Sequence, residues 1–454
     1  MFVNREEEIS RLKRVMDAGE SKLVIIYGRR RCGKSTLLKK LMSSSMIYFA
    51  ADMREKALQI KALSIRIDAM IPGFSVPMYP DWDSLFRSLN NALKSRIALI
   101  IDEFPYLVKN SPELPSVLQN IYDDKAHSNF TFILCGSSQM MMHGLVLDAN
   151  APLYGRADEI LKIQPMSVAH LRKYLGISAD EAVTEYSIWG GVPRYWEIRK
   201  SSGSLEDALS EHVINQYGLL TDEPERLFSD EIRTSVQAFT LLSLIGSGSH
   251  RLSELAGRIG KPATHLSNAL AFLTELRYIR REIPFGESLR STKKSIYRIN
   301  DPFLNFYFTF VVPDKSRIEL GHRTRVLKDI KKRMELYVSS EWEELCRQSV
   351  PGLKMGEEFG PASRWWGKGL DGKPLEVDIV SESYDKTKII VGEVKWNKKG
   401  DLSGAAKELM RKTDLLPFRK NYEVIPVLFV RNKPERITGN IRIFSPDEVV
   451  EALK

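Results

Sequence analysis

The nine residues 28–36, GRRRCGKST, constrain the fold of this chain more than any other segment, because they fit the pattern G-x-x-x-x-G-K-[ST]. An apolar run, KLVIIY, precedes them and a helix-forming run, KSTLLKKLM, follows them. A strand, a glycine-containing loop and a helix in this order form the context in which the pattern marks a phosphate-binding loop. Backbone N–H groups of the loop and of the first helical turn surround the phosphates in such a site. We therefore predict that ATP binds here, with Gly28, Arg29, Arg30, Arg31, Cys32, Gly33, Lys34, Ser35 and Thr36 forming the loop.

A second segment, ALIIDEFPYL, supplies the acids that such a site needs. In the predicted roles, Lys34 reaches the β- and γ-phosphates, Ser35 binds Mg²⁺ directly, and Asp102 holds Mg²⁺ through water. Glu103 orients or deprotonates the attacking water. Because no other role for Glu103 is evident, the pair predicts hydrolysis as well as binding.

A third apolar run, FTFILCGSSQM, ends in two serines. Side chains at the carboxyl edge of a parallel sheet face the ligand. Ser137 is therefore predicted to contact the γ-phosphate or the water, and Ser138 is an equal candidate for this role. The alternative is that these serines only cap a helix.

Apolar runs and helical segments alternate over the first 164 residues, through KLVIIYG, SMIYFA, IALIID and FTFILCGSS. Strands that are apolar on both faces and separated by helices indicate a parallel sheet covered on both sides. The predicted fold class is thus α/β. We predict four domains: a nucleotide-binding core over 1–164, a helical lid over 165–229, a winged helix-turn-helix over 230–311, and an α/β domain over 312–454.

Composition favours a polyanionic partner and an intracellular location. The 67 Lys and Arg exceed the 58 Asp and Glu, which gives a net charge of +9. A basic balance favours nucleic acid as a partner. The three cysteines, Cys32, Cys135 and Cys346, are widely separated and fit a reducing compartment. No signal peptide and no apolar run near ~18 residues is evident, so we expect a soluble cytoplasmic protein.

Three helical segments followed by a basic hairpin predict the winged helix-turn-helix. Its recognition helix is expected to be ATHLSNALAFLTELR, with short polar groups that face DNA bases: Thr264, His265, Ser267 and Asn268. Five basic residues are candidates for phosphate contacts: Arg258, Lys261, Arg290, Lys293 and Lys294. The alternative is a module that only connects domains.

The segment LEVDIVSESYDKTKIIVGEVKW carries the second suggestive pattern. Strand alternation places Glu376 and Asp378 on one face, and Glu393 and Lys395 on one face of the next strand. Carboxylates and a lysine in this arrangement are suited to holding Mg²⁺ and activating water for attack on a phosphodiester. Acids on solvated strands are the alternative.

Several of these motifs, together with FVNREEEISRL, PLYGR and GGVPRYW, resemble the archaeal-type ATPases of the AAA+ (STAND-related) class that carry a C-terminal nuclease-like domain. The resemblance covers essentially the whole chain. It implies that Asn4 and Arg5 lie at the adenine-side entrance and that Arg156 is an arginine finger, acting within its own subunit or on a neighbour. It also implies that Gly191 and Pro193 belong to a lid motif that packs on the nucleotide.

The loop arginines match the arginine-rich loop of that family. Arg29, Arg30 and Arg31 are predicted to face outward toward the lid, a neighbouring domain or subunit, or DNA. Direct contact with phosphate is the alternative. The oligomeric state stays open, and a homo-oligomer is required if Arg156 acts on a neighbour.

The C-terminal pattern resembles the PD-(D/E)xK nuclease superfamily, which implies a further acid on an earlier helix. Within SSEWEELCRQ the family pattern selects Glu343 over Glu341 and Glu344. The implied metal ligands are Glu343, Asp378 and Glu393, and the implied catalytic lysine is Lys395.

The function that we predict is an Mg-ATP-hydrolysing ATPase whose turnover changes the lid angle and repositions modules that bind DNA and cleave it with metal. Two alternatives remain open. One is an ATP-gated DNA-binding regulator that cleaves nothing, and the other is a signalling ATPase with protein partners.

Overall fold

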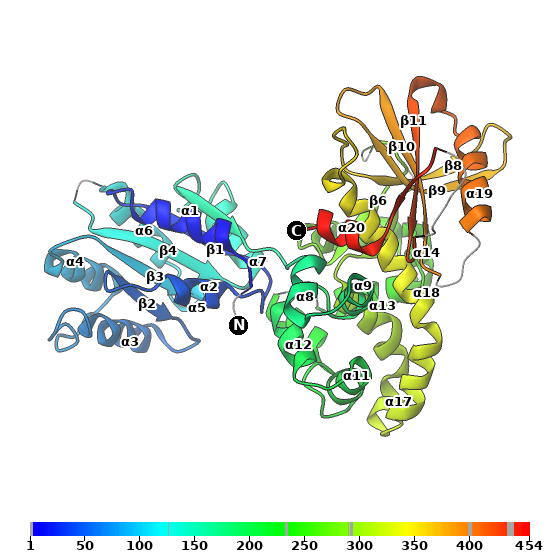
Figure 1. The fold of residues 1–454 in the computed structure, drawn as a ribbon. Coiled ribbons are helices and arrows are strands. Elements are labelled where there is room, and N and C mark those ends of the chain that lie inside the picture. The colour runs from blue at the N-terminus through cyan, green and yellow to red at the C-terminus, as the bar shows by residue number, and fades with distance from the viewer. Residues whose placement is uncertain are drawn as a thin grey trace. The chain divides into compact units, whose positions relative to one another are not determined.

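Five strands of the N-terminal part form one parallel sheet in the order β2-β3-β4-β1-β5 (Figure 1). They are β1 Leu23–Tyr27, β2 Met46–Ala50, β3 Ile97–Asp102, β4 Phe130–Gly136 and β5 Glu159–Lys162. The structure is a computed structural model that describes residues 3–125, 127–231, 235–288, 290, 294–397, 402–433 and 440–454. The chain divides into two compact units. Unit 1 extends to Pro165 and also takes in a short segment that starts at Asp230, and unit 2 begins at Met166. The parallel sheet is the framework of unit 1.

Burial follows the strand order of this sheet. Every residue of β3 and β4 is buried, as are the first four residues of β1. The edge strands β2 and β5 bury only alternate or single positions. Because helices cover both faces of a parallel sheet, its central strands are apolar on both sides, whereas its edge strands keep a polar side. The α/β class predicted from the apolar runs is confirmed.

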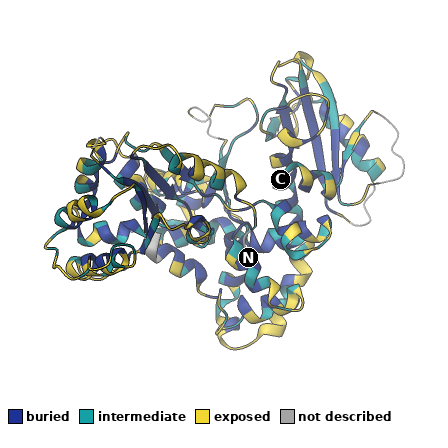
Figure 2. Ribbon diagram, turned by 60° about the vertical axis from the view of Figure 1, so that its left-hand side comes forward, coloured by how far each residue is buried: buried dark blue, intermediate teal, exposed yellow. Residues whose placement is uncertain are grey.

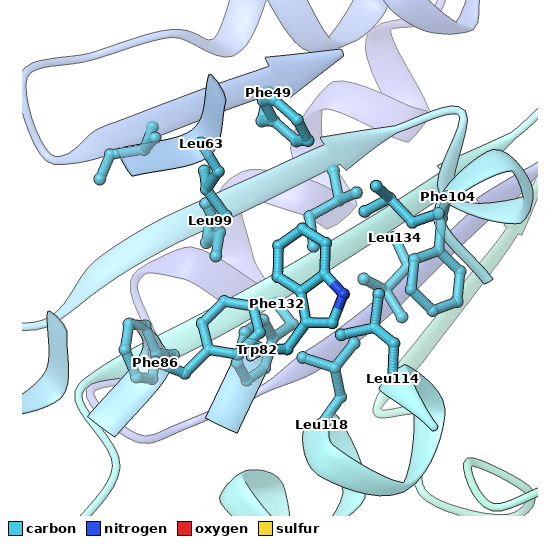
Figure 3. Close-up of a cluster of buried hydrophobic side chains, with 14 of the residues drawn as sticks. Phe49, Leu63, Trp82, Phe86, Leu99, Phe104, Leu114, Leu118, Phe132 and Leu134 are labelled. Carbon is cyan, nitrogen blue, oxygen red and sulfur yellow. The ribbon is translucent and has the colours of Figure 1, made fainter. Parts of the chain in front are cut away.

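The helices of unit 1 pack their apolar stripes on the sheet. They are α1 Glu6–Met16, α2 Lys34–Leu41, α3 Lys56–Asp68, α4 Trp82–Ala92, α5 Phe104–Asn110, α6 Leu114–Asp123, α7 Gln139–Met142 and a π-helical turn His143–Leu147. A cluster of buried aromatic and aliphatic side chains joins several of them to the strands (Figure 3). Trp82 lies within it and donates its indole N–H to Ser111 Oγ at 2.8 Å, so its one polar atom is satisfied. This core fixes the strand ends that carry the candidate site.

Unit 2 opens with five helices: α8 Val168–Leu175, α9 Ala179–Trp189, α10 Pro193–Lys200, α11 Leu205–His212 and α12 Glu223–Glu231. The turn between α9 and α10 contains Gly190, at φ +58°, and a Cβ there would lie 3.2 Å from Pro302. The Tyr195 ring packs 4.5 Å from that of Phe303. The motif GGVPRYW therefore packs against the segment that starts at Pro302.

Three helices and an antiparallel two-stranded hairpin follow, in the order that the sequence predicts. They are α13 Ser235–Gly246, α14 Leu252–Ile259, α15 Ala263–Glu275, β6 Ile279–Glu282 and β7 Ile296–Ile299. Lys293, a predicted phosphate contact, lies outside the described residues.

The last part contains a mixed sheet in the order β12-β11-β10-β9-β8. Its strands are β8 Ser363–Lys368, β9 Pro374–Glu382, β10 Lys388–Lys395, β11 Glu423–Val430 and β12 Arg442–Phe444. The helices are α16 Pro302–Phe306, α17 Lys315–Glu319, α18 Arg323–Ser349, α19 Leu402–Asp414 and α20 Pro446–Ala452, with a π-helical turn Tyr307–Val311 after α16. Strands β8, β9 and β10 are antiparallel, whereas β10, β11 and β12 run parallel. The central strand β10 is buried except at its two ends, and β9 and β11 are buried over part of their length (Figure 2).

None of the helices in the described part of the chain is both long and apolar enough to cross a bilayer.

Candidate functional site

The loop between β1 and α2 is held against the segment that follows β5. Gly28 has φ +151°, and a Cβ on it would lie 2.3 Å from the Ile163 carbonyl oxygen. Only glycine fits that approach. Arg31 and Gly33 also have left-handed φ values, of +67° and +89°. The loop thus turns sharply before Lys34 begins α2.

Lys34 lies at the centre of this loop. Its side chain is 5% exposed, and Nζ donates to the carbonyl oxygens of Gly28 at 2.8 Å and Arg29 at 3.0 Å. Ser35 is half-buried beside it, and Thr36 is exposed. The positive charge of Lys34 therefore lies beside the N-terminus of α2, where the backbone N–H groups of the first turn favour an anion.

Asp102 and Glu103 end β3 in the same region. Asp102 is 3% exposed; its Oδ1 accepts the Glu103 N–H at 3.0 Å and its Oδ2 accepts the Tyr48 hydroxyl at 2.6 Å. Glu103 has φ +55°, a left-handed conformation that costs a residue other than glycine ~1 kcal/mol. Residues held in such strain cluster at functional sites, and the turn carries the Glu103 side chain toward β4.

Ser137 and Ser138, at the end of β4, have different contacts. The Ser137 hydroxyl lies 2.9 and 2.8 Å from the two Glu103 oxygens, and its N–H lies 3.2 Å from Oε2. Ser138 instead accepts the Met141 N–H at 3.3 Å and caps α7. Of the two candidates, Ser137 is the one that contacts a predicted catalytic group.

The outward orientation predicted for the three loop arginines is wrong for Arg29, which is 6% exposed. Arg30 is exposed and Arg31 half-buried. Arg29 directly follows Gly28, where the loop is pressed against the chain after β5, so its side chain is enclosed.

The predicted entrance residues lie next to the loop. Arg5 is buried and donates to the carbonyl oxygens of Cys32 at 3.4 Å and Gln164 at 2.5 Å. Arg5 and the exposed Asn4 both have left-handed φ values, of +91° and +60°. The sequence contains no signal for these backbone contacts, and a role at the adenine stays a prediction.

Arg156 lies at the edge of the sheet opposite the phosphate loop. It precedes β5 and forms a bidentate pair with Asp123 at 2.9 Å, and Asp123 ends the helix that precedes β4. In a parallel sheet the amino ends of β4 and β5 lie away from the carboxyl end of β1. Arg156 therefore does not reach the phosphate loop of its own subunit, and the prediction that it acts there is wrong. Action on a neighbouring subunit stays a prediction.

Gly191 and Pro193 belong to unit 2. Gly191 is buried, and its carbonyl oxygen accepts the Met166 N–H at 2.8 Å. Pro193 is the first residue of α10. These contacts lie within unit 2, and a role for either residue at the nucleotide stays a prediction.

A groove of about 1310 Å³ runs between α15 and the hairpin of β6 and β7. One side is a row of small residues on α15, and Asp and Glu are absent from the described residues that line the groove. Its basic lining residues are Arg251, Arg277, Arg280 and Arg281. Of the predicted base-reading residues only Ser267 lines the groove. Thr264, His265 and Asn268 are exposed, as are Arg258, Lys261, Arg290 and Lys294.

The predicted C-terminal acids come together on α18, β9 and β10. Gly392 pairs with Ile379 across the two antiparallel strands, so Asp378 and Glu393 are the next residues along each. Asp378 Oδ2 accepts the Val394 N–H at 3.0 Å. Burial and the charge of Asp378 raise the pKa of Glu343 and also that of Glu393. Three carboxylates thus share one partly buried region.

Two lysines form ion pairs with Glu393 in this region. Lys395 Nζ lies 3.4 Å from its Oε2, and Lys412 of α19 lies 2.6 Å from its Oε1. Sequence reasoning missed Lys412, because only the packing of α19 brings it to the acids. Within the described ranges, no group of three or more Asp, Glu, His or Cys side chains is arranged to hold a metal ion. Glu343, Asp378 and Glu393 thus lie near one another without forming a metal-binding arrangement in the described structure, and their role as metal ligands stays a prediction.

A buried network of charges links the hairpin to α18 and β8. Glu282 accepts Arg280 at 2.8 Å, and Arg280 also pairs with Glu344 of α18 at 3.2 Å. Burial opposes ionisation of Glu282, but the charge of Arg280 lowers its pKa to about 2. Arg364 of β8 lies 3.7 Å from the same carboxylate. The inner face of the hairpin thus packs on α18 and β8 through these ion pairs.

Two family descriptions match the chain. Residues 2–197 match an ATPase domain found predominantly in Archaea, and residues 307–409 match archaeal and bacterial proteins of unknown function. An uncharacterized protein of Methanocaldococcus jannaschii is 31% identical over 437 residues, which are 94% of this chain and 95% of the relative. An uncharacterized ATP-binding protein of the same organism is 47% identical over 47 residues, which are 10% of this chain and 80% of that protein.

Among solved structures, the Walker-type ATPase of Pyrococcus abyssi has a similar fold, with a TM-score of 0.52 at 20% identity. The match covers 68% of this chain and 96% of that protein.

Proposed function

The chain belongs to one family with the uncharacterized protein of Methanocaldococcus jannaschii that it matches over 94% of its length, and its residues 2–197 match an ATPase domain found predominantly in Archaea; we therefore propose that it hydrolyses Mg-ATP at the loop of residues 28–36. We further propose that this ATPase acts on DNA. The first proposal rests on the ATPase domain and on the loop, and the second rests on the groove of unit 2.

The observation that carries the proposal of hydrolysis is the position of Glu103. Its carboxylate is fixed by Ser137 on the neighbouring strand, at the edge of the sheet where Lys34 and Asp102 also lie. An acid held in this way by a strained turn is expected to have a role beyond stabilising the fold.

Each residue has a defined task in this proposal. Lys34 neutralises charge on the β- and γ-phosphates, and the N–H groups of the loop bind their oxygens. Ser35 and Asp102 suit Mg²⁺, which proteins commonly hold with one or two side chains plus the phosphates and water; bound there, the ion would neutralise charge on the phosphates. Glu103 orients the attacking water and accepts its proton.

Two substitutions separate binding from hydrolysis. Lys34→Ala is expected to abolish both nucleotide binding and phosphate release. Glu103→Gln is expected to bind ATP as wild type does and to lose ~10² or more in turnover, because a neutral amide accepts no proton. Glu113→Gln, at an exposed acid of unit 1, is the control. Full turnover in Glu103→Gln would refute the assignment.

DNA is proposed to bind in the groove between α15 and the hairpin. The groove has arginines and small residues but no acids among its described lining residues. Phosphate binding by arginine gives the strong salt dependence that is characteristic of protein–DNA contacts.

Duplex DNA affinity, measured across salt concentrations, tests this proposal. Replacing Arg251 and Arg277 by alanine is expected to weaken binding and to reduce the slope of log K against log salt by about 2. The matched control replaces Arg258 and Lys261, which are exposed outside the groove. Equal losses in both variants would place DNA elsewhere. No binding to DNA in wild type would favour a signalling ATPase with protein partners.

DNA cleavage is a second candidate function, and the clustering of Asp378, Glu393 and Lys395 on β9 and β10 favours it. An assay with Mg²⁺ or Mn²⁺, on plasmid and branched DNA, with and without ATP, tests it. Cleavage that Asp378→Ala and Lys395→Ala both abolish would support a nuclease. Absence of cleavage in every condition would favour an ATP-gated DNA-binding regulator.

A further inference from the structure

Both carboxylate oxygens of Asp102 are held in the structure. Oδ1 accepts the N–H of Glu103 at 3.0 Å, a contact that the backbone alone provides. Oδ2 accepts the hydroxyl of Tyr48 at 2.6 Å. Tyr48 is therefore the side chain that sets the rotation of the carboxylate about its χ angles.

The register of the sheet explains why Tyr48 reaches Asp102. On the parallel neighbours β2 and β3, Tyr48 pairs with Ile100 and Ala50 pairs with Asp102. Alternate residues of a strand share a face, so Tyr48 and Asp102 point to the same side, two residues apart along the strands. A side chain as long as tyrosine spans this diagonal, and the small side chain of Ala50 leaves the space open.

A basic residue of α2 also lies near Tyr48. Lys39 Nζ is 5.8 Å from the centre of the Tyr48 ring. A tyrosine hydroxyl carries its proton at neutral pH, so Tyr48 is the donor in the bond to Asp102.

We propose that Tyr48 is a positioning residue of the magnesium site, whose hydroxyl fixes the carboxylate of Asp102. This inference rests on the proposed hydrolysis of Mg-ATP. Groups that orient the partners of a bound metal ion contribute about 10- to 100-fold to metal affinity. Loss of the hydroxyl leaves Asp102 held only through Oδ1, by the N–H of Glu103. Contacts that the loop makes with the nucleotide without metal are expected to be unaffected.

Unit 1 contains a matched control. The hydroxyl of Tyr122 donates to Asp158 Oδ2 at 2.9 Å, and this bond lies at the amino end of β1, because Asp158 also accepts the Leu23 N–H at 2.8 Å. Tyr122→Phe thus removes the same kind of bond from the same unit, at the edge opposite the phosphate loop.

The experiment measures the affinity of the full chain for a fluorescent ATP analogue, in EDTA and across a Mg²⁺ titration. Tyr48→Phe is expected to bind the analogue in EDTA as wild type does. Its Mg²⁺ midpoint is expected to rise about 10- to 100-fold. Tyr122→Phe is expected to leave both quantities unchanged and to lower only the melting temperature.

The outcomes separate this inference from the proposed function. Binding by wild type that depends on Mg²⁺, with an unchanged midpoint in Tyr48→Phe, overturns the role of Tyr48 alone. An equal loss of affinity in EDTA and in Mg²⁺ also overturns it, because it would show a general disturbance of the loop. A wild-type protein that binds no ATP analogue in either condition overturns the proposed function and this inference together.

Discussion

The bond between Ser137 and Glu103 leads to a prediction about turnover. Ser137→Ala removes a hydroxyl that lies 2.8 and 2.9 Å from the two oxygens of Glu103. A hydrogen bond to a charged group is worth about 1.5–3 kcal/mol, so kcat for ATP is expected to fall about 10- to 100-fold. KM is expected to stay within about 2-fold of the wild-type value, because the Ser137 hydroxyl is bonded to Glu103 in the structure; a large rise in KM would instead favour direct contact with the γ-phosphate. Ser137→Thr, which keeps the hydroxyl, should restore kcat.

Ser138→Ala is the control for this prediction. It removes the cap of α7 and is expected to cost about 0.5–2 kcal/mol of stability without changing kcat per folded molecule. Higher turnover in Ser137→Ala would show instead that the bond holds Glu103 away from the water.

Gly28 and Gly33 provide a second comparison at the scale of single residues. A methyl group on Gly28 would lie 2.3 Å from a backbone oxygen, whereas one on Gly33 would meet nothing within 4 Å. Both have positive φ, so Gly33→Ala is expected to cost ~1 kcal/mol through backbone strain alone. Gly28→Ala also forces Ile163 or the loop to move, so chemical denaturation should show a loss at least about 2 kcal/mol larger. Equal losses would contradict the close packing of the loop.

Among the elements, the central strands were the most predictable. The continuous apolar runs of β1, β3 and β4 directly specify strands buried on both faces. Residues at the ends of these strands, such as Asp102 and Ser137, could therefore be placed at one edge of the sheet from sequence.

Contacts between distant elements were less predictable. The burial of Arg29 depends on how closely Ile163 approaches Gly28, and the position of Lys412 depends on how α19 packs on β10. Tyr48 carries no motif, and only the pairing of β2 with β3 brings it to Asp102. Such contacts depend on tertiary packing, which local sequence patterns do not encode.

The packing of α16 against α18 predicts a pH effect on stability. Asn305 of α16 donates to Glu341 of α18 at 2.6 Å. Burial raises the pKa of Glu341 from 4.5 to about 7, although the charge of Arg280 opposes the shift. Between these two values the folded state keeps a proton that the unfolded state releases, so the contribution of Glu341 to stability falls as the pH rises from 4.5 to about 7.

Glu341→Gln replaces the protonated acid by a neutral amide and should remove this loss. At pH 8 the free energy of unfolding of the variant is expected to exceed that of wild type by about 1–3 kcal/mol. At pH 4.5 the two free energies are expected to be nearly equal. Denaturant titrations across this pH range measure the difference. Glu335→Gln, at an exposed position of the same helix, is the control. Its free energy of unfolding should differ from that of wild type by the same amount at every pH. The same constant difference for Glu341→Gln would contradict the assignment.

At the scale of the whole molecule, the helices that sequence reasoning assigned to a separate lid are part of unit 2. Asp180 of α9 forms a bidentate pair with Arg431 at the end of β11, at 2.6 and 2.7 Å. The Arg431 guanidinium also lies 4.7 Å from the ring centre of Trp396. These contacts tie α9 to the C-terminal sheet, so any motion driven by ATP that moves α9 is expected to carry the carboxylate cluster with it.

The division into two units predicts two thermal transitions that respond to different changes. Saturating Mg-ATP should raise only the transition of unit 1, by about 2.7 kcal/mol at 100 times Kd. Asp180→Asn should lower only the transition of unit 2, because it breaks a charged bidentate pair that is partly buried. Asp447→Asn, at a pair with Arg172 whose acid is exposed, should change neither transition by more than about 1 kcal/mol. Calorimetry of the full chain measures all three. In the alternative, the helices of 166–229 move with the nucleotide-binding unit. Mg-ATP would then protect them, and Asp180→Asn would leave the C-terminal sheet unaffected. A single transition that both changes shift would contradict the division into two units.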